Sequence, residues 1–130
     1  RGVVDAGYKR GNVVIVGRGG QAILQGRPGV LHVRIEAPLE HRIQRLMDRD
    51  ETTPTQAELQ IEDHDRAARD YVKRYYDLDP HDPMHYHLLI NTGLLDLETA
   101  AQVIALAVQQ MQPVAQPEYE APAAMPFFYP

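Results

Sequence analysis

The sequence lacks cysteine and tryptophan altogether and has no long apolar run. Without cysteine there can be neither a disulfide framework nor thiolate chemistry, which fits a reducing compartment, so we expect a cytoplasmic protein. No apolar run approaches the roughly 18 residues that a membrane-spanning helix needs, and we expect no membrane partner. A net charge of −5 over 130 residues argues against a nucleic-acid partner, because coating nucleic acid depends on an excess of Lys and Arg.

Lysine is almost absent too, since eleven of the thirteen cationic residues are arginines. The planar fork of arginine pairs two-pronged with phosphate or carboxylate. Six cations form two rows with i, i+3, i+7 spacing on expected helices: Arg42, Arg45 and Arg49, then Arg66, Arg69 and Lys73. One interpretation is a solvated surface crossed by salt bridges, and a high arginine content can also reflect genomic base composition. The other is a site for a nucleotide or another small phosphorylated ligand.

The stretch VVIVGRGGQAIL carries a pattern close to a nucleotide-binding fingerprint. Gly17, Gly19 and Ala22 fit G-x-G-x-x-A, the dinucleotide-binding pattern. That pattern needs a full crossover helix after the turn, but only residues 21–25 can be helical before glycine and proline intervene. No lysine follows the glycines, so the turn is not a P-loop either. The remaining interpretation is a strand ending at the carboxyl edge of a parallel sheet, with Arg18 placed to meet an anion.

Short runs rich in Val and Ile alternate with helical patterns along the chain. The expected strands are residues 13–17, 30–36 and 88–92. The expected helices are residues 39–49, 55–76 and 96–112. The strands are apolar nearly throughout, which is typical of strands that are buried on both faces. The sequence therefore predicts an α/β fold, with a parallel sheet covered by helices.

The sequence also predicts where the second helix begins and which face of the last helix is buried. Thr55 is a candidate N-cap of the second helix, with Glu58 at the spacing of a capping box. The last helix has one apolar stripe, which we expect to pack on the sheet. Its members are Leu97, Ala101, Ile104, Val108 and Met111.

The composition changes after the last helix. Residues 113–130 are rich in proline, which precludes a helix or an interior strand. We therefore divide the chain into a domain, residues 1–112, and a proline- and aromatic-rich tail, residues 113–130. The tail is either a linker or an extended docking arm. In the second case, the docking arm would be anchored by Phe127, Phe128 and Tyr129, either on its own domain or on a neighbouring copy of the chain. Anchoring on a neighbouring copy would form a homo-oligomer.

Three stretches of the chain carry a resemblance to a known family. They are VVIVGRG, then APLEHRIQRL with its A-x-x-E-x-R-x-x-R run, and YHLLINT before the last helix. Together they resemble the cytidylate kinase-like family, within the P-loop nucleoside monophosphate kinases. The similarity spans roughly residues 10–108 and corresponds to the C-terminal two-thirds of such a kinase. It implies an incomplete P-loop kinase-like α/β fold.

The resemblance also implies roles for individual residues. Arg18 would touch the nucleoside monophosphate, and Gly17 and Gly19 would allow its close approach, although those kinases have an aspartate where Gly19 stands. A D-x-x-R match implies a substrate-binding aspartate and an arginine on the transferred phosphates. The substrate-binding set is Gly17, Arg18, Gly19, Asp63 and Arg69. The catalytic set is Arg66 with the helix arginines Arg42 and Arg45.

The function implied by the resemblance is ATP-dependent phosphorylation of a nucleoside monophosphate, CMP-like, or a related acceptor, with Mg²⁺ accompanying ATP. The family's N-terminal strand and phosphate-binding loop have no counterpart here, so the chain alone should not catalyse transfer. We expect a piece of a longer kinase, completed by a P-loop segment or a partner chain. The alternative is a non-catalytic nucleotide- or anion-binding or protein-interaction module derived from a kinase fold.

Two further clusters have competing interpretations. The histidines and aspartates of DLDPHDPMHYH, residues 77–87, suggest a metal site, but their spacing fits no zinc pattern and the prolines favour a surface loop. We therefore assign no metal ligand. Tyr71, Tyr75 and Tyr76 would stack on a base in one interpretation, and belong to a core or an interface in the other.

Overall fold

The computed structural model describes residues 2–111, and these fall into two compact units. Of the described residues, the first unit contains residues 2–30 and Met111, and the second contains residues 31–110. The tail expected at residues 113–130, with its aromatic anchors, lies outside the described residues. No helix in the described part of the chain is long and apolar enough to cross a membrane.

The first unit contains two helices, α1 (Gly2–Arg10) and α2 (Gly20–Ile23). Val4 of α1 is fully buried. The Tyr8 hydroxyl donates a hydrogen bond to the Pro28 carbonyl at 3.0 Å, which ties α1 to the loop that ends the unit. The sequence analysis did not predict α1, whereas the short α2 agrees with its expectation of a crossover too short for a dinucleotide site.

The strand predicted at residues 13–17 is not observed, and the prediction is corrected here. This segment contains one isolated bridge residue, Ile15, and no regular strand. Val14 is 79% exposed. A strand exists only where a neighbouring strand satisfies its N–H and C=O groups, and the described part of this unit contains no other strand. Within residues 2–30, this apolar, β-branched run therefore has no regular strand beside it.

The second unit contains a two-stranded parallel sheet, β1 (Val33–Glu36) and β2 (Leu88–Asn91). Both strands lie inside the ranges that the sequence predicted. Ile35 stands opposite Ile90 in the register, and Ile90 is buried. A parallel pair needs a crossover connection, and helices supply it here.

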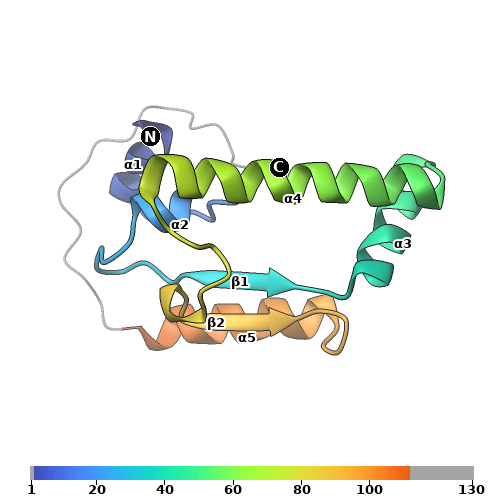
Figure 1. Cartoon of the computed structure of the whole chain (residues 1–130). Helices are drawn as coiled ribbons and strands as arrows, with labels where there is room; N and C mark the ends of the chain where they lie inside the picture. The colour runs from blue at the N-terminus through green and yellow to red at the C-terminus, as the bar shows by residue number, and fades with distance from the viewer. Residues whose placement is uncertain (1, 112–130) are drawn as a thin grey trace. The chain divides into compact units, whose positions relative to one another are not determined.

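Two helices form most of that crossover, α3 (Leu39–Asp50) and α4 (Pro54–Tyr76). They contact each other as a hairpin, and Ala57 and Ile61 on α4 are buried. After α4, residues 77–87 lead back to the sheet through the short 3-10 helix η1 (Pro83–His85). In Figure 1, α4 runs along the sheet and α3 closes one end. We call α3, α4 and residues 77–87 the arch.

The start of α4 differs from the prediction. Thr53, not Thr55, is the N-cap: its hydroxyl accepts from the Gln56 N–H at 3.2 Å, and the Gln56 side chain accepts from the Thr53 N–H. The capping box therefore begins two residues earlier than the predicted pair of Thr55 and Glu58. Pro54 explains the shift, because proline is favoured at the first helical position, where its fixed φ suits a helix and a backbone N–H would have no partner within the helix.

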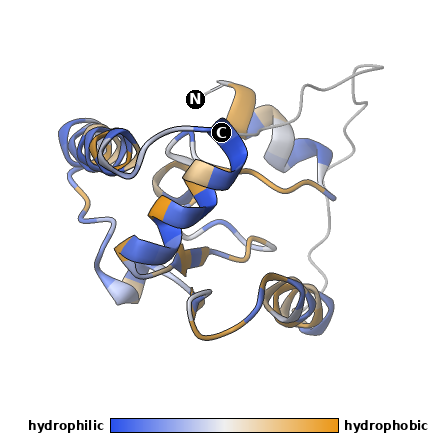
Figure 2. Cartoon of the chain, turned by 90° about the vertical axis from the view of Figure 1, so that its right-hand side faces the viewer, coloured by the Kyte–Doolittle hydropathy of each residue, from blue (hydrophilic) through white to orange (hydrophobic). Residues whose placement is uncertain are grey.

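The last helix, α5 (Leu97–Gln110), lies on the other side of the sheet from α4 (Figures 1 and 2). Figure 2 looks along both helices and shows α4 as mainly hydrophilic and α5 as far more hydrophobic. The predicted stripe is displaced: Leu97, Ala101 and Val108 are exposed, whereas Ala100 is buried. Ile104 of the predicted stripe is half-buried, as is Ala107, so the covered face runs through Ala100, Ile104 and Ala107. The observed class remains α/β, with a small parallel sheet between helices.

Candidate functional site

The predicted site residues are divided between the two units. Gly17, Arg18 and Gly19 belong to the first, and all the others belong to the second. Within the second unit, Arg42 reaches α4 and Arg45 reaches the end of the sheet, whereas Asp63, Arg66 and Arg69 lie on the exposed surface of α4.

The glycine turn of the first unit is built from left-handed residues. Gly17, Arg18 and Gly19 have φ values of 71°, 60° and 66°. Gly19 caps α2, and a Cβ atom on Gly20 would lie 3.0 Å from the Ile15 side chain. Two of the three left-handed positions are glycines because this region of φ penalises a Cβ atom. The Arg18 side chain is exposed at the tip of the turn.

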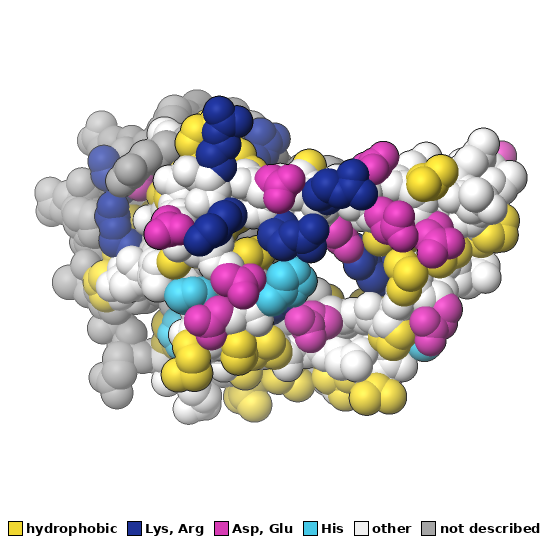
Figure 3. All heavy atoms as spheres, in the orientation of Figure 1, with side chains coloured by type: hydrophobic (Ala, Val, Ile, Leu, Met, Phe, Trp, Pro, Cys, Tyr) yellow, Lys and Arg dark blue, Asp and Glu magenta, His cyan; other side chains and the backbone are white. Residues whose placement is uncertain are grey.

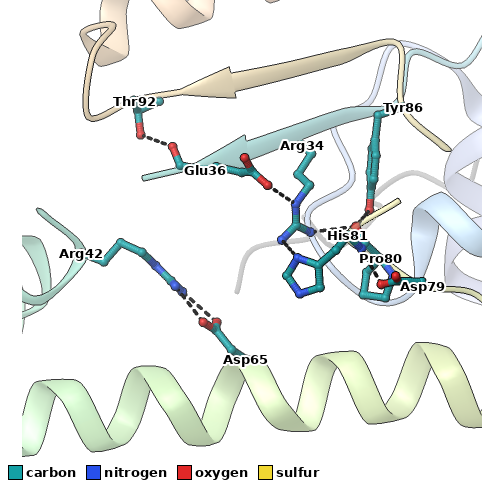
Figure 4. Close-up of polar contacts among 9 residues, drawn as sticks. All are labelled: Arg34, Glu36, Arg42, Asp65, Asp79, Pro80, His81, Tyr86 and Thr92. Atoms are coloured by element: carbon teal, nitrogen blue, oxygen red, sulfur yellow. Dashed lines mark hydrogen bonds and ion pairs between the residues drawn. The ribbon is translucent and has the colours of Figure 1, made fainter. Parts of the chain in front are cut away.

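In the second unit, Arg42 of α3 reaches Asp65 of α4. Its Nη1 and Nη2 atoms lie 2.7 Å from Oδ2 and Oδ1 of Asp65, which is a two-pronged ion pair (Figure 4). The hydrogen bonds raise the pKa of Arg42 and lower the pKa of Asp65, against a smaller opposing effect of burial. Asp65 was not predicted as a site residue, although it lies between the predicted Asp63 and Arg66.

Arg45, one turn along α3, is turned toward the sheet. Its Nη1 and Nη2 atoms donate to the hydroxyl and the carbonyl of Thr92, at 3.0 and 2.9 Å. Thr92 is buried directly after β2, and its N–H donates to the Glu36 carbonyl at the end of β1. Arg45 therefore fixes α3 to the carboxyl ends of both strands. The predicted role of Arg42 and Arg45 on a ligand remains a prediction, and both have partners within the protein.

The other predicted residues lie on the exposed surface of α4. Arg66 is 62% exposed, and its Nη1 atom is 3.8 Å from Oδ1 of Asp63, a loose pair within one helical turn. Arg69 is exposed one turn further along. Figure 3 shows exposed Lys and Arg side chains on this face of the molecule, interspersed with Asp and Glu side chains. Positive charge on α4 is thus available to an anion in solution.

Arg34 is a site residue that the sequence analysis missed. Its Nε atom donates to Glu36 at 2.8 Å, and its Nη1 atom donates to the Pro80 carbonyl at 3.1 Å. Its Nη2 atom lies 3.0 Å from Nδ1 of His81 (Figure 4). Burial opposes the charge of Arg34, but hydrogen bonds to Glu36 and Tyr86 raise its pKa. The available signal was an arginine inside an apolar strand, with a carboxylate two residues on.

The histidines of residues 77–87 take part in local contacts. His81 meets Arg34, and Nδ1 of His87 accepts from the His32 N–H at 2.9 Å. The rings of His32 and His87 are stacked, with centroids 5.6 Å apart. Within residues 2–111, no group of three or more His, Asp or Glu side chains is arranged to hold a metal ion. Mg²⁺ is usually bound by one or two carboxylates together with the phosphates of a ligand, so the Mg²⁺ expected to accompany ATP remains a prediction.

In the second unit, α3 and α4 connect two parallel strands, and arginines of α3 reach both the sheet and α4. This arrangement is an α/β architecture and is consistent with a kinase-like fold. The chain belongs to the Cytidylate kinase-like family, whose sequence profile matches residues 2–94. The family predicted from the three sequence stretches is therefore confirmed.

The chain is similar to proteins of two different names, in each case over part of the relative's length. A cytidylate kinase of Methanospirillum hungatei is 30% identical over 83 residues, which are 63% of this chain and 47% of that protein. A protein of Corynebacterium glutamicum named uronate isomerase is 31% identical over 109 residues, 84% of this chain but 20% of that protein. The chain thus spans between a fifth and about half of these relatives.

A solved structure from Eubacterium ventriosum resembles the fold. The superposition has a TM-score of 0.74 at 23% identity and covers 82% of this chain and 60% of the other. At this identity the likeness concerns the fold alone.

Proposed function

We propose that this chain is the acceptor-binding portion of an ATP-dependent nucleotide kinase that phosphorylates a nucleoside monophosphate such as CMP. The observation that carries the proposal is family membership over residues 2–94. The arginines of the arch support it, because phosphoryl transfer is accelerated mainly by positioning and by positive charge around the transferred group.

Each set of residues has a proposed part in this reaction. Arg66 and Arg69 bind phosphate from the exposed surface of α4, and Asp63 contacts the acceptor. Arg18 contacts the acceptor from the glycine turn, where Gly17 and Gly19 allow the backbone to approach a ligand. In the proposal, Arg42 joins the phosphate site, and Arg45 holds α3 at the edge of the sheet where open α/β folds bind ligands.

On this proposal, the residues that bind ATP are supplied by another segment or chain. The 130 residues contain no G-x-x-x-x-G-K-[ST] stretch, the loop whose backbone N–H groups and lysine hold the phosphates of ATP. We propose that a P-loop segment or partner chain supplies it, that Mg²⁺ arrives with ATP, and that the reaction is cytoplasmic. On this proposal, the 130 residues alone bind the acceptor but do not transfer a phosphoryl group to it.

A second candidate is a non-catalytic nucleotide- or anion-binding module. The observation that favours it is the match to the C. glutamicum protein, because a stretch similar to this chain there makes up a fifth of a protein named for another activity. In that case the arginines of the arch would bind an anion without transferring it.

Calorimetric titration of the chain with CMP, cytidine and ATP-Mg²⁺ tests the proposal. We expect CMP to bind and cytidine to bind at least tenfold more weakly, because a charge-assisted contact to phosphate contributes more than 1.4 kcal/mol. Arg66→Ala and Arg69→Ala should each weaken CMP binding, and Arg10→Ala serves as the control. CMP binding no tighter than that of cytidine would rule the proposal out. Binding of inorganic phosphate and CMP with equal affinity would favour the anion-binding module.

A further inference from the structure

Asp65 stands at the point where the contact between α3 and α4 ends. Ala57, Ile61 and Asp65 follow one another at four-residue intervals and lie on one stripe of α4. The first two are buried, and the third pairs with Arg42. Apolar packing therefore holds the hairpin near its turn, and an ion pair holds it at the open end.

The pair is accessible to solvent. The side chains of Arg42 and Asp65 are 36% and 41% exposed. Ion pairs at this degree of exposure contribute little to stability, so a stronger anion can replace the carboxylate at small cost. Both oxygens of Asp65 are used on Arg42, one on each terminal nitrogen. These are the donors that a phosphate group would use in its own two-pronged contact.

Two arginines of α4 follow Asp65 closely. Arg66 is the next residue, and Arg69 lies one turn beyond Asp65 on the same stripe. Carboxylates alternate with them, and among these Asp65 is paired with the arginine on the opposite helix. An anion that binds the α4 arginines therefore lies close to the Arg42–Asp65 ion pair, where it can compete with the carboxylate for Arg42.

We propose that Asp65 occupies the phosphate-binding side of Arg42 in the unliganded protein, and that a phosphate group displaces Asp65 and loosens the open end of the α3–α4 hairpin. The proposal rests on the proposed function insofar as the ligand phosphate is that of the acceptor nucleotide. Asp65 is then a specificity-determining residue. A ligand must exceed a carboxylate in charge to take its place, which favours a phosphate dianion over carboxylate ligands.

Binding measurements separate this exchange from a purely structural role. Removal of the competing carboxylate in Asp65→Asn should tighten binding of inorganic phosphate and of CMP by up to about fivefold, the range of an exposed ion pair. Asp65→Glu keeps the charge and should restore the original affinity. Asp50→Asn is the matched control, because Asp50 holds Arg49 with both oxygens at the other end of α3. If Asp65 only orders Arg42, Asp65→Asn weakens binding and the proposal fails.

A distance measurement supplies a second test that does not depend on affinity. Because the sequence has no cysteine, spin labels can be attached at His41→Cys on α3 and Ala68→Cys on α4, both exposed positions. We expect phosphate to lengthen or broaden the distance distribution between the labels, and Asp65→Asn to show that distribution without phosphate. A distribution that neither change alters would overturn the proposal.

The two proposals fail in different ways. If CMP binds no better than inorganic phosphate, and phosphate still moves the labels, the acceptor assignment is wrong and the exchange holds. If CMP binds tightly while Asp65→Asn changes neither affinity nor distance, the acceptor assignment holds and the exchange is wrong.

Discussion

Arg45 donates to both the hydroxyl and the carbonyl of Thr92, and this contact joins α3 to the end of the sheet. The Thr92 hydroxyl also donates to the Glu36 carbonyl at 3.2 Å, so the three residues connect one helix and two strands. One side chain therefore holds together three segments that are far apart in the sequence.

Arg45→Ala should lower the free energy of unfolding by about 1–3 kcal/mol, because it leaves polar atoms of the buried Thr92 without their donor. Urea unfolding measures the change. Arg49→Ala is the control, since Arg49 is 73% exposed and should change stability by less than about 0.5 kcal/mol. Equal losses in the two variants would show that the Thr92 contact does not stabilise the fold.

Gly93→Ala should also destabilise the protein. A Cβ atom there would lie 2.4 Å from Cδ of Pro38 and 3.0 Å from its Cγ, and a proline ring has little freedom to move aside. We expect a loss of about 1–3 kcal/mol, measured by thermal unfolding. A Cβ atom on Gly2 meets nothing within 4 Å, so Gly2→Ala should leave the melting temperature unchanged or slightly raised. An unchanged melting temperature in Gly93→Ala would mean that the turn readjusts freely.

The position of the α4 cap predicts a difference between two neighbouring threonines. Thr53→Ala removes the hydroxyl that accepts from the Gln56 N–H, and should cost about 1 kcal/mol of stability. Thr55→Ala changes an exposed residue inside the first turn of the helix and should cost much less. Chemical unfolding of both variants decides between them. A larger loss in Thr55→Ala would restore the cap predicted from the sequence.

Pairing with Arg42 lowers the pKa of Asp65 below its ordinary value of 3.8. A lowered pKa in the folded state contributes stability that is present above pH 3.8 and is lost as pH falls through the lowered value. Asp65→Asn should therefore be less stable than the original protein at pH 7, and the difference should shrink as pH falls below 3.8 and through the lowered pKa of Asp65. Asp70→Asn, an exposed carboxylate on the same helix, is the control. A difference that persists in acid would show that the effect does not come from the ion pair.

The sequence predicted most of the helices and strands of the second unit from the pattern of apolar side chains within each segment. Periodicity located α3, α4 and α5, and short apolar runs located β1 and β2, because these signals depend on the face that each segment buries. Residues 13–17 carry the same signal as β1, and the prediction there was wrong because a strand also depends on its neighbour. The displaced stripe of α5 has a similar cause. Leu97 and Val108 are the larger side chains, but burial depends on how closely the helix approaches the sheet.

The contacts of the site were harder to predict than its residues. The i, i+3 spacing suggested that Arg42 and Arg45 act together, whereas they point to different partners 27 residues apart in sequence, Asp65 and Thr92. Arg34 was missed because its partners Pro80 and His81 lie more than 40 residues away. Sequence patterns indicate chemistry and local geometry, but pairings of this range depend on the folded crossover.

The arch is closed by contacts at both ends of the sheet, and this has a consequence for how the second unit opens. Pro80 and His81 are joined to β1 through Arg34, and α3 is joined to β2 through Arg45. Hydrogen-exchange protection follows cooperative units rather than single bonds. The amides of His87 and Thr92, which flank β2 and donate across the sheet, should therefore lose protection together. The crossover and the two strands form one unit of cooperative opening.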